Sequence, residues 1–142
     1  MHALTPDSLL LALHGSIILL SGLVAGFFFA RAIARSSGEV AWRVVHAGGC
    51  AAGTMLLAIA VPLQWVSLPG HVADLLLWSL LTGTYLLVVG MFVAAIWKTR
   101  GIPGGGKFAN RVVRVLYATG AVLSLVGCVL LVVGLFLACC LT

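Results

Sequence analysis

Four long runs of this sequence contain no Asp, Glu, Lys or Arg, and they constrain the fold more than any other feature. The runs cover residues 8–30, 44–73, 75–97 and 115–142. Each run reaches the roughly 20 residues that an α-helix needs to cross the hydrocarbon core of a bilayer. Of the 142 residues, only 8% are charged, whereas roughly a quarter are charged in a soluble globular domain. The sequence therefore predicts an all-α membrane protein, a bundle of four transmembrane helices.

The expected helices use nearly the whole chain, so we expect one integral membrane domain over residues 1–142. The helices cover approximately residues 8–34, 37–66, 72–97 and 109–139. The second helix should begin near Ser37, because Ser36-Ser37-Gly38-Glu39 fits a capping box, in which Ser and Glu side chains satisfy free amides at a helix start. Segment 98–107 is too rich in Gly and Pro to be helical, so we expect a flexible basic hairpin there.

The eight basic residues flank the first and third connections between the expected helices. They are Arg31, Arg35, Arg43, Lys98, Arg100, Lys107, Arg111 and Arg114. By the positive-inside rule these two connections lie in the cytoplasm, and both termini lie on the non-cytoplasmic side. The net charge of +5 is therefore a topology signal, which contact with membrane lipid headgroups explains without a nucleic-acid partner.

Small residues recur at the spacing of close helix contacts. They are Gly15, Gly22 and Gly26 in the first helix, and Gly120, Gly127 and Gly134, joined by Ser124 and Ala138, in the fourth. Apolar burial does not drive helices together in lipid. Such stripes therefore hold together either the four-helix unit or an oligomer of it.

His46 is the ionisable residue that most needs an explanation, because polar groups at membrane depth mark functional sites by default. With the second helix starting near Ser37, His46 lies about ten residues into it, roughly 15 Å along the helix. Trp42 precedes His46 by one turn, and Gly49 and Gly53 follow it on the same face. A haem held by an imidazole lies close to the helix that carries the ligand, and small residues on that face would clear space for the ring. The alternative is a neutral imidazole that is hydrogen-bonded to a carbonyl or hydroxyl group of an adjacent helix.

The other titratable residues narrow the chemistry. The acids are Asp7, Glu39 and Asp74, all at or near an interface. A buried carboxylate pair for acid–base catalysis or proton-coupled transport is therefore absent from the sequence. His14, His71 and Asp74 form a second possible metal-binding group near the external face. Because His14 and His46 are expected near opposite faces of the membrane, both could not bind one haem. A haem on His46 would then be five-coordinate, with an open position.

The second expected helix resembles that of the styrene oxide isomerase family, a group of small four-helix membrane enzymes from aromatic-degrading bacteria. The matching stretch is Trp42-x-x-x-His46-x-Gly48-x-x-x-x-Gly53-x-Met55. Weaker matches are His14-Gly15, Gly83-Thr84-Tyr85 and the Arg100-Gly101 hairpin that leads to the fourth helix. The resemblance covers most of the chain, and the stretch from Trp42 to Met55 is its specific part.

This resemblance implies a homotrimer in the bacterial inner membrane that binds haem b near its subunit interfaces. His46 would be the axial ligand of the iron, and Tyr85 would be the active-site tyrosine that orients the substrate. The ferric iron of the family acts as a Lewis acid on the oxygen of an apolar aromatic epoxide, as in styrene degradation. Ring opening and a 1,2-shift then yield an aldehyde without net redox, which is a Meinwald rearrangement.

One departure from the family pattern lies at Ala52, where the family has an Asn next to the substrate. Thr54, Thr82 or Thr84 would then have to supply a hydroxyl group that holds the epoxide. The basic residues expected to meet haem propionates are Arg43, Arg111 and Arg114. The aromatic residues expected to wall a dry cavity are Tyr85, Trp78, Phe27, Phe28, Tyr117 and Trp42.

Two other functions remain open. The first is a haem-binding membrane protein without isomerase activity, for electron transfer or haem handling, which the departure at Ala52 favours. The second is a cofactor-free accessory membrane subunit, whose purified preparation would be colourless.

Overall fold

The computed structural model describes residues 5–66, 68–102 and 108–141. Within these ranges it contains no β-strand and four α-helices: α1 (Pro6–Ala34), α2 (Glu39–Leu63), α3 (Gly70–Trp97) and α4 (Phe108–Leu141). All four helices are long and apolar enough to span a membrane. The predicted all-α protein with four transmembrane helices is therefore confirmed, and each helix end lies within three residues of its predicted position.

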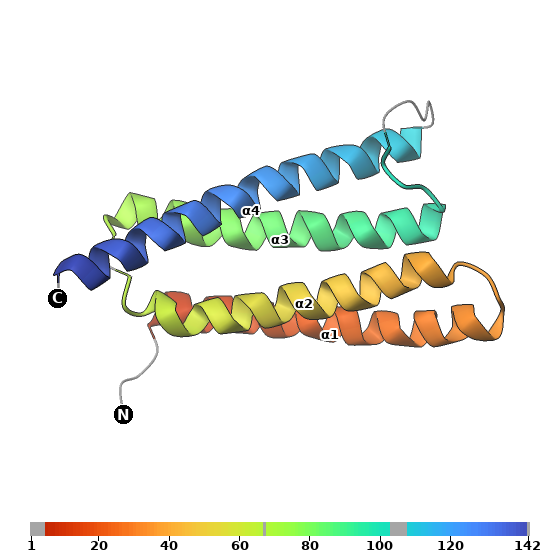
Figure 1. The fold of residues 1–142 in the computed structure, drawn as a ribbon, viewed down its shortest axis with the longest axis horizontal. Coiled ribbons are helices and arrows are strands. Elements are labelled where there is room, and N and C mark those ends of the chain that lie inside the picture. The colour runs from red at the N-terminus through yellow and green to blue at the C-terminus, as the bar shows by residue number, and fades with distance from the viewer. Residues whose placement is uncertain (1–4, 67, 103–107, 142) are drawn as a thin grey trace.

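Figure 1 shows the chain as two antiparallel hairpins, α1 with α2 and α3 with α4. Each hairpin is tightly packed along its length, and the two hairpins meet mainly where α2 contacts α3. In an apolar 18-residue stretch of α3, 44% of the residues are buried within the chain, whereas the share in the corresponding stretch of α4 is 17%. Helix α3 is therefore the central helix, and most of α4 faces outward.

Glycines make the close approach within each hairpin possible. A Cβ atom at Gly22 would collide with the backbone of Cys50, and a Cβ atom at Gly53 would collide with the backbone of Leu19. In the second hairpin, a Cβ atom at Gly120 would collide with the backbone of Gly83, and one at Gly127 would collide with the side chain of Leu80. The predicted small-residue stripes are therefore confirmed as helix contacts within the hairpins at Gly22, Gly120 and Gly127, whereas Gly134 meets Val66 and Leu68 in the connection before α3.

The connection between α1 and α2 differs from the predicted capping box. Helix α2 begins at Glu39, and its N-cap residue Gly38 has a φ of 79° and makes no side-chain capping bond. The two serines instead close α1, because the amides of Ser36 and Ser37 donate to carbonyl oxygens in the last turn of that helix. A short reversal between antiparallel helices needs left-handed backbone, which Gly38 adopts without strain. The predicted start near Ser37 is therefore wrong by two residues.

The described part of the connection after α3 is anchored by side-chain hydrogen bonds. Lys98 ends α3 in the left-handed region, with a φ of 52°. Thr99 Oγ1 donates to Asn110 Oδ1 over 2.9 Å, and Asn110 Nδ2 donates to the carbonyl oxygen of Ile102 over 2.6 Å. Residues 98–102 are non-helical, as predicted. The remainder of the predicted hairpin, residues 103–107, lies outside the described residues.

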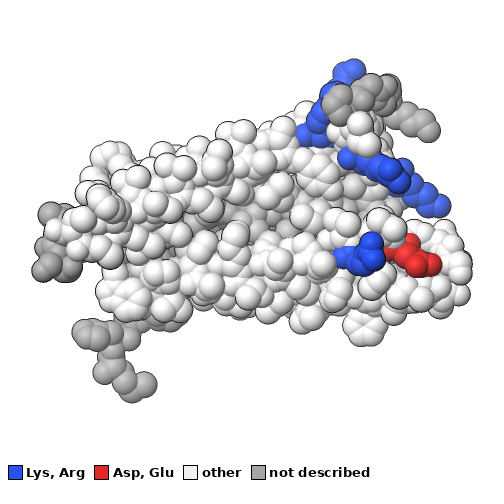
Figure 2. All heavy atoms as spheres, in the orientation of Figure 1, with Lys and Arg blue, Asp and Glu red and all other residues white. Residues whose placement is uncertain are grey.

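Figure 2 shows the Lys and Arg side chains gathered at one end of the bundle. At this end α1 leads into α2 and α3 leads toward α4, whereas α1 begins and α4 ends at the opposite end (Figure 1). We call the end with the Lys and Arg side chains, where α1 leads into α2, the basic end. The prediction that the basic residues share one side is therefore confirmed for those that the structure describes, which exclude Lys107. That this side faces the cytoplasm stays a prediction.

Candidate functional site

The imidazole of His46 is held by the neighbouring helix. His46 lies seven residues after Glu39, about 10 Å into α2, which is less than predicted because the helix begins later. Its Nδ1 atom lies 2.8 Å from the backbone carbonyl oxygen of Gly22 on α1. A carbonyl oxygen accepts a hydrogen bond and cannot donate one, so Nδ1 carries the proton. In the neutral imidazole, Nε2 then keeps a lone pair for a ligand.

The ring of His46 is packed tightly on the α1 side. A Cβ atom at Gly26 would lie 3.2 Å from His46 Nδ1, so this glycine makes room for the imidazole. The Phe29 ring stacks beside it at a centroid distance of 6.4 Å and an interplanar angle of 23°. The Sγ atom of Cys50, one turn along α2, lies 3.8 Å from Nδ1. These contacts fix the ring in the seam between α1 and α2.

Three aromatic side chains, Phe28, Trp42 and Phe92, form an aromatic cluster one turn from His46. Trp42 stacks on Phe28 at 4.7 Å between ring centroids and meets the edge of Phe92 at 6.3 Å. The three residues come from α1, α2 and α3, so the aromatic cluster joins both hairpins. The sequence pointed to Trp42 and Phe28 but missed Phe92, because no local pattern places this residue of α3 beside α2.

The other aromatic residues predicted as cavity walls lie elsewhere. Phe27 is 80% exposed and Trp78 is 57% exposed, so both side chains face away from the bundle core. Tyr117 packs against Gly90 within the second hairpin and, together with Trp42, lines a groove between the two hairpins. The aromatic surroundings of His46 are therefore the aromatic cluster and Phe29.

Gly49 and Gly53 pack against α1 within the protomer. A Cβ atom at Gly49 would lie 2.8 Å from Gly22 Cα, and one at Gly53 would collide with the backbone of Leu19. The room that the sequence suggested for a cofactor ring on this face is filled by the α1 backbone. These two glycines therefore serve the packing of α2 on α1.

Tyr85 pairs with His14 and lies at a different depth from His46. The Tyr85 hydroxyl oxygen lies 2.9 Å from His14 Nδ1, and the two rings meet edge-on at a centroid distance of 5.6 Å. His14 precedes Gly22 by eight residues on α1, so the pair lies about 12 Å farther from the basic end than His46 does. The sequence did not indicate the pairing, because 71 residues separate its partners. The fold of the chain therefore does not bring Tyr85 and His46 together.

The threonine hydroxyl groups expected to replace the polar group missing at Ala52 are either hydrogen-bonded within a helix or exposed. Ala52 is half-buried and packs against the core. Thr54 and Thr82 are exposed on the outer surface. Thr84 is fully buried, and its hydroxyl group donates to the carbonyl oxygen of Leu80 over 2.7 Å.

The basic residues predicted to meet propionates are all exposed, at the basic end. Arg43 lies on α2, three residues before His46. Arg111 and Arg114 lie near the start of α4, which packs mainly against α3. Arg43 is therefore the basic residue that shares a helix with the imidazole.

The described residues do not form a metal site made of protein ligands alone. The described residues contain no group of three His, Cys, Asp or Glu side chains that would hold a metal ion. His71 and Asp74 are both exposed near the start of α3, while His14 bonds to Tyr85. The predicted alternative site at His14, His71 and Asp74 is therefore not assembled.

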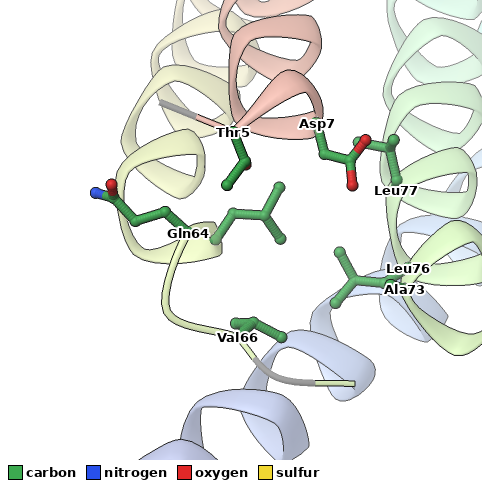
Figure 3. Close-up of a pocket in the computed structure, with 8 residues that line it drawn as sticks. Thr5, Asp7, Gln64, Val66, Ala73, Leu76 and Leu77 are labelled. Atoms are coloured by element: carbon green, nitrogen blue, oxygen red, sulfur yellow. The ribbon is translucent and has the colours of Figure 1, made fainter. Parts of the chain in front are cut away.

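A small pocket of about 120 Å³ lies at the opposite end of the bundle. Figure 3 shows Thr5, Asp7 and Gln64 around it, with Leu76 and Leu77 of α3 on the other side. Asp7 is the one ionisable side chain in its lining. The pocket therefore offers no second group for acid–base chemistry.

Comparison with known proteins yields a family match. A family model described as styrene oxide isomerase matches residues 7–136. The matched range includes parts of all four helices and contains both His46 and Tyr85. No curated protein and no solved structure matches the chain.

Proposed function

Because the chain belongs to the styrene oxide isomerase family, we propose that it is a membrane isomerase that converts an aryl epoxide to an aldehyde. In this Meinwald rearrangement one C–O bond of the epoxide breaks, and a hydrogen moves with its electron pair to the neighbouring carbon. A carbonyl group forms, and no atom or electron is gained or lost. The family name supports the isomerase class, and the four apolar helices support a membrane location. We further propose a homotrimer in a bacterial inner membrane.

His46 is the proposed ligand of haem b. The observation that carries this proposal is the hydrogen bond from Nδ1 to the Gly22 carbonyl oxygen. This bond leaves the lone pair of Nε2 available to bind a metal ion. A bare metal ion would need about three or more protein ligands, and the described residues offer no such group. A haem needs only an axial ligand from the protein, so a single imidazole suits it. When bound, the iron would supply Lewis-acid polarisation of the epoxide oxygen.

The side chains and backbone near His46 have roles of their own in this proposal. The Gly22 carbonyl group fixes the tautomer and the ring orientation of His46. The aromatic cluster offers an apolar wall that excludes water, which favours rearrangement of the developing cation over hydrolysis to a diol. Arg43, one turn before His46, offers a guanidinium group for a propionate.

Haem content tests the ligand assignment. We expect the purified wild type to show a Soret band and a pyridine haemochrome, and His46→Ala to lose nearly all of its haem. His71→Ala is the matched control, because His71 is exposed at the start of α3 and should retain full haem content. Equal haem content in His46→Ala and wild type would show that His46 is not the ligand.

Product analysis tests the reaction class. We expect the haem-loaded wild type to convert an aryl epoxide to the aldehyde without added reductant or NAD(P)H, with all substrate carbon recovered as aldehyde. A haem-loaded sample that yields only diol, or no product from a panel of aryl epoxides, would remove the isomerase proposal.

A second candidate is a haem protein of the same fold without isomerase activity. Ala52 supplies no polar group, and the Tyr85 hydroxyl group is bonded to His14, about 12 Å in depth from His46. These two observations favour this candidate. Iron that exchanges electrons with a quinol, in a sample that leaves epoxides unchanged, would decide for it.

A further inference from the structure

A groove of about 780 Å³ opens between the two hairpins at the basic end. The first turns of α2 form one wall, and the last turns of α3 form the other. Its lining residues are Ser37, Gly38, Glu39, Val40, Ala41, Trp42, Val44, Met91, Ala94, Ala95, Lys98, Thr99, Arg100 and Tyr117. The groove shares Trp42 with the aromatic cluster, whereas the contacts of the His46 ring itself face α1.

The lining changes character along the groove. Lys98 and Arg100, both exposed, stand at the end nearest the connections, together with Glu39. Farther into the bundle the walls are apolar, from Val44 on α2 to Met91 on α3. Met91 and Lys98 are seven residues apart, so this apolar wall extends for about 10 Å along α3. The groove is thus amphipathic along the membrane normal.

The charges at the mouth favour an anion. Two cations and one carboxylate leave the lining side chains with a net charge of +1. The first turn of α2 adds the positive end of a helix dipole, and its N-cap residue Gly38 makes no side-chain capping bond. Basic residues at this depth of a membrane protein attract anionic lipid headgroups.

We propose that this groove binds one anionic glycerophospholipid. Its phosphate would lie at Lys98 and Arg100, and an acyl chain would follow the apolar walls formed by Val40, Val44 and Met91. The order of the chemistry from the mouth inward, cationic and then aliphatic, matches the order of headgroup and chain in a lipid. A second copy of the chain or a haem in the groove would lack this lipid selectivity.

Photo-crosslinking tests the proposal on the full-length protein in vesicles. A phosphatidylglycerol with a diazirine in its acyl chain is compared with the phosphatidylcholine analogue at the same mole fraction, and labelled residues are mapped by mass spectrometry. We expect phosphatidylglycerol to label residues 40–44 and 91–95 about fivefold more than phosphatidylcholine does. The exposed α4 residues Val122 and Val132 report general lipid contact and should show no such preference.

A pair of double variants separates groove binding from general surface charge. Lys98→Asn with Arg100→Gln removes both groove cations, and Asn tolerates the left-handed backbone of position 98. Arg111→Gln with Arg114→Gln removes two charges at the same end outside the groove. We expect the preference for phosphatidylglycerol to disappear in the double variant at Lys98 and Arg100 and to persist in the double variant at Arg111 and Arg114.

Three outcomes would overturn the proposal. The first is equal labelling of the groove by the two lipids. The second is an equal loss of preference in both double variants, which would indicate a diffuse surface effect. The third is an unlabelled groove, which would indicate that protein or cofactor fills it. None of these readouts depends on haem content or isomerase activity.

Discussion

His46 and His14 are both half-buried in membrane-spanning helices, yet their Nδ1 atoms meet different partners. The partner of His46 is a backbone carbonyl oxygen, which can only accept, so the tautomer with a free Nε2 is selected. The partner of His14 is the Tyr85 hydroxyl group, which can donate or accept, so neither tautomer is selected. The acceptor on the neighbouring helix, rather than the residue type, therefore decides which histidine keeps a lone pair on Nε2.

The two histidines also differ in what their hydrogen bonds join. The bond of His46 lies within the first hairpin, between α1 and α2. The bond of His14 links α1 to α3 and so connects the two hairpins. His46 is thus oriented by a closely packed pair of helices, whereas His14 contributes to the packing of one hairpin on the other.

Of the variants that test this difference between His46 and His14, Gly22→Ala is expected to have the largest effect. A Cβ atom at position 22 would collide with Cys50 and force apart the helices that orient His46. We expect the free energy of unfolding in detergent to fall by about 1–3 kcal/mol, the usual cost of overpacking. Haem content should fall as well, because the carbonyl group that orients His46 moves with α1.

Gly70→Ala is the control for this variant, because a Cβ atom at position 70 meets nothing within 4 Å. Its stability and haem content should match the wild type. If Gly22→Ala kept both properties, the tight seam between α1 and α2 would not be what orients His46.

A smaller effect is expected from removing the pair formed by His14 and Tyr85. Interhelical hydrogen bonds in membranes contribute about 0.6 kcal/mol on average and reach about 2 kcal/mol. We expect His14→Leu and Tyr85→Phe each to lower stability by an amount in this range, with the double variant close to either single one. Unfolding curves of the four proteins provide the measurement.

The haem content of the same variants is a second measurement. Both single variants should keep the haem content of the wild type, because the pair lies about 12 Å from His46 along the bundle. Strictly additive stability effects would show that the two side chains do not interact. Loss of haem in His14→Leu would show that the two histidines do not have separate roles.

The smallest effect is expected at Thr54, which lies on α2 beyond His46. Its side chain is exposed on the outer surface, so Thr54→Val should change stability by less than about 0.5 kcal/mol. Epoxide turnover should also stay unchanged. A clear drop in turnover with normal haem content would instead indicate that Thr54 meets the substrate from a neighbouring subunit.

Much of the fold was predictable because the bilayer imposes strong local rules. The four spans, the shared side of the basic residues and the close-packing role of Gly22 and Gly120 all follow from composition and short spacings. The start of α2 was not predictable in the same way. The Ser-Ser-Gly-Glu stretch fits a capping box locally, but the antiparallel return of the chain requires left-handed backbone at Gly38.

The candidate site was predictable only in part. The sequence pointed to His46 because it is an ionisable residue in an apolar span, and it pointed to Trp42 by helical spacing. It did not indicate Gly22 as the acceptor, Phe92 as part of the aromatic cluster, or His14 as the partner of Tyr85. Each of these contacts joins different helices, and no local pattern encodes which residues of two helices meet.

The sequence by itself determined that this chain is a four-span membrane protein with one deep histidine of interest and its basic residues on one side. Hydropathy and charge act residue by residue, so these properties do not depend on how the helices pack. The tertiary structure decided which nitrogen of His46 is free, that the glycines beside it meet α1, and where a groove lies between the hairpins. These features depend on the relative register of helices, which only packing across the bundle sets.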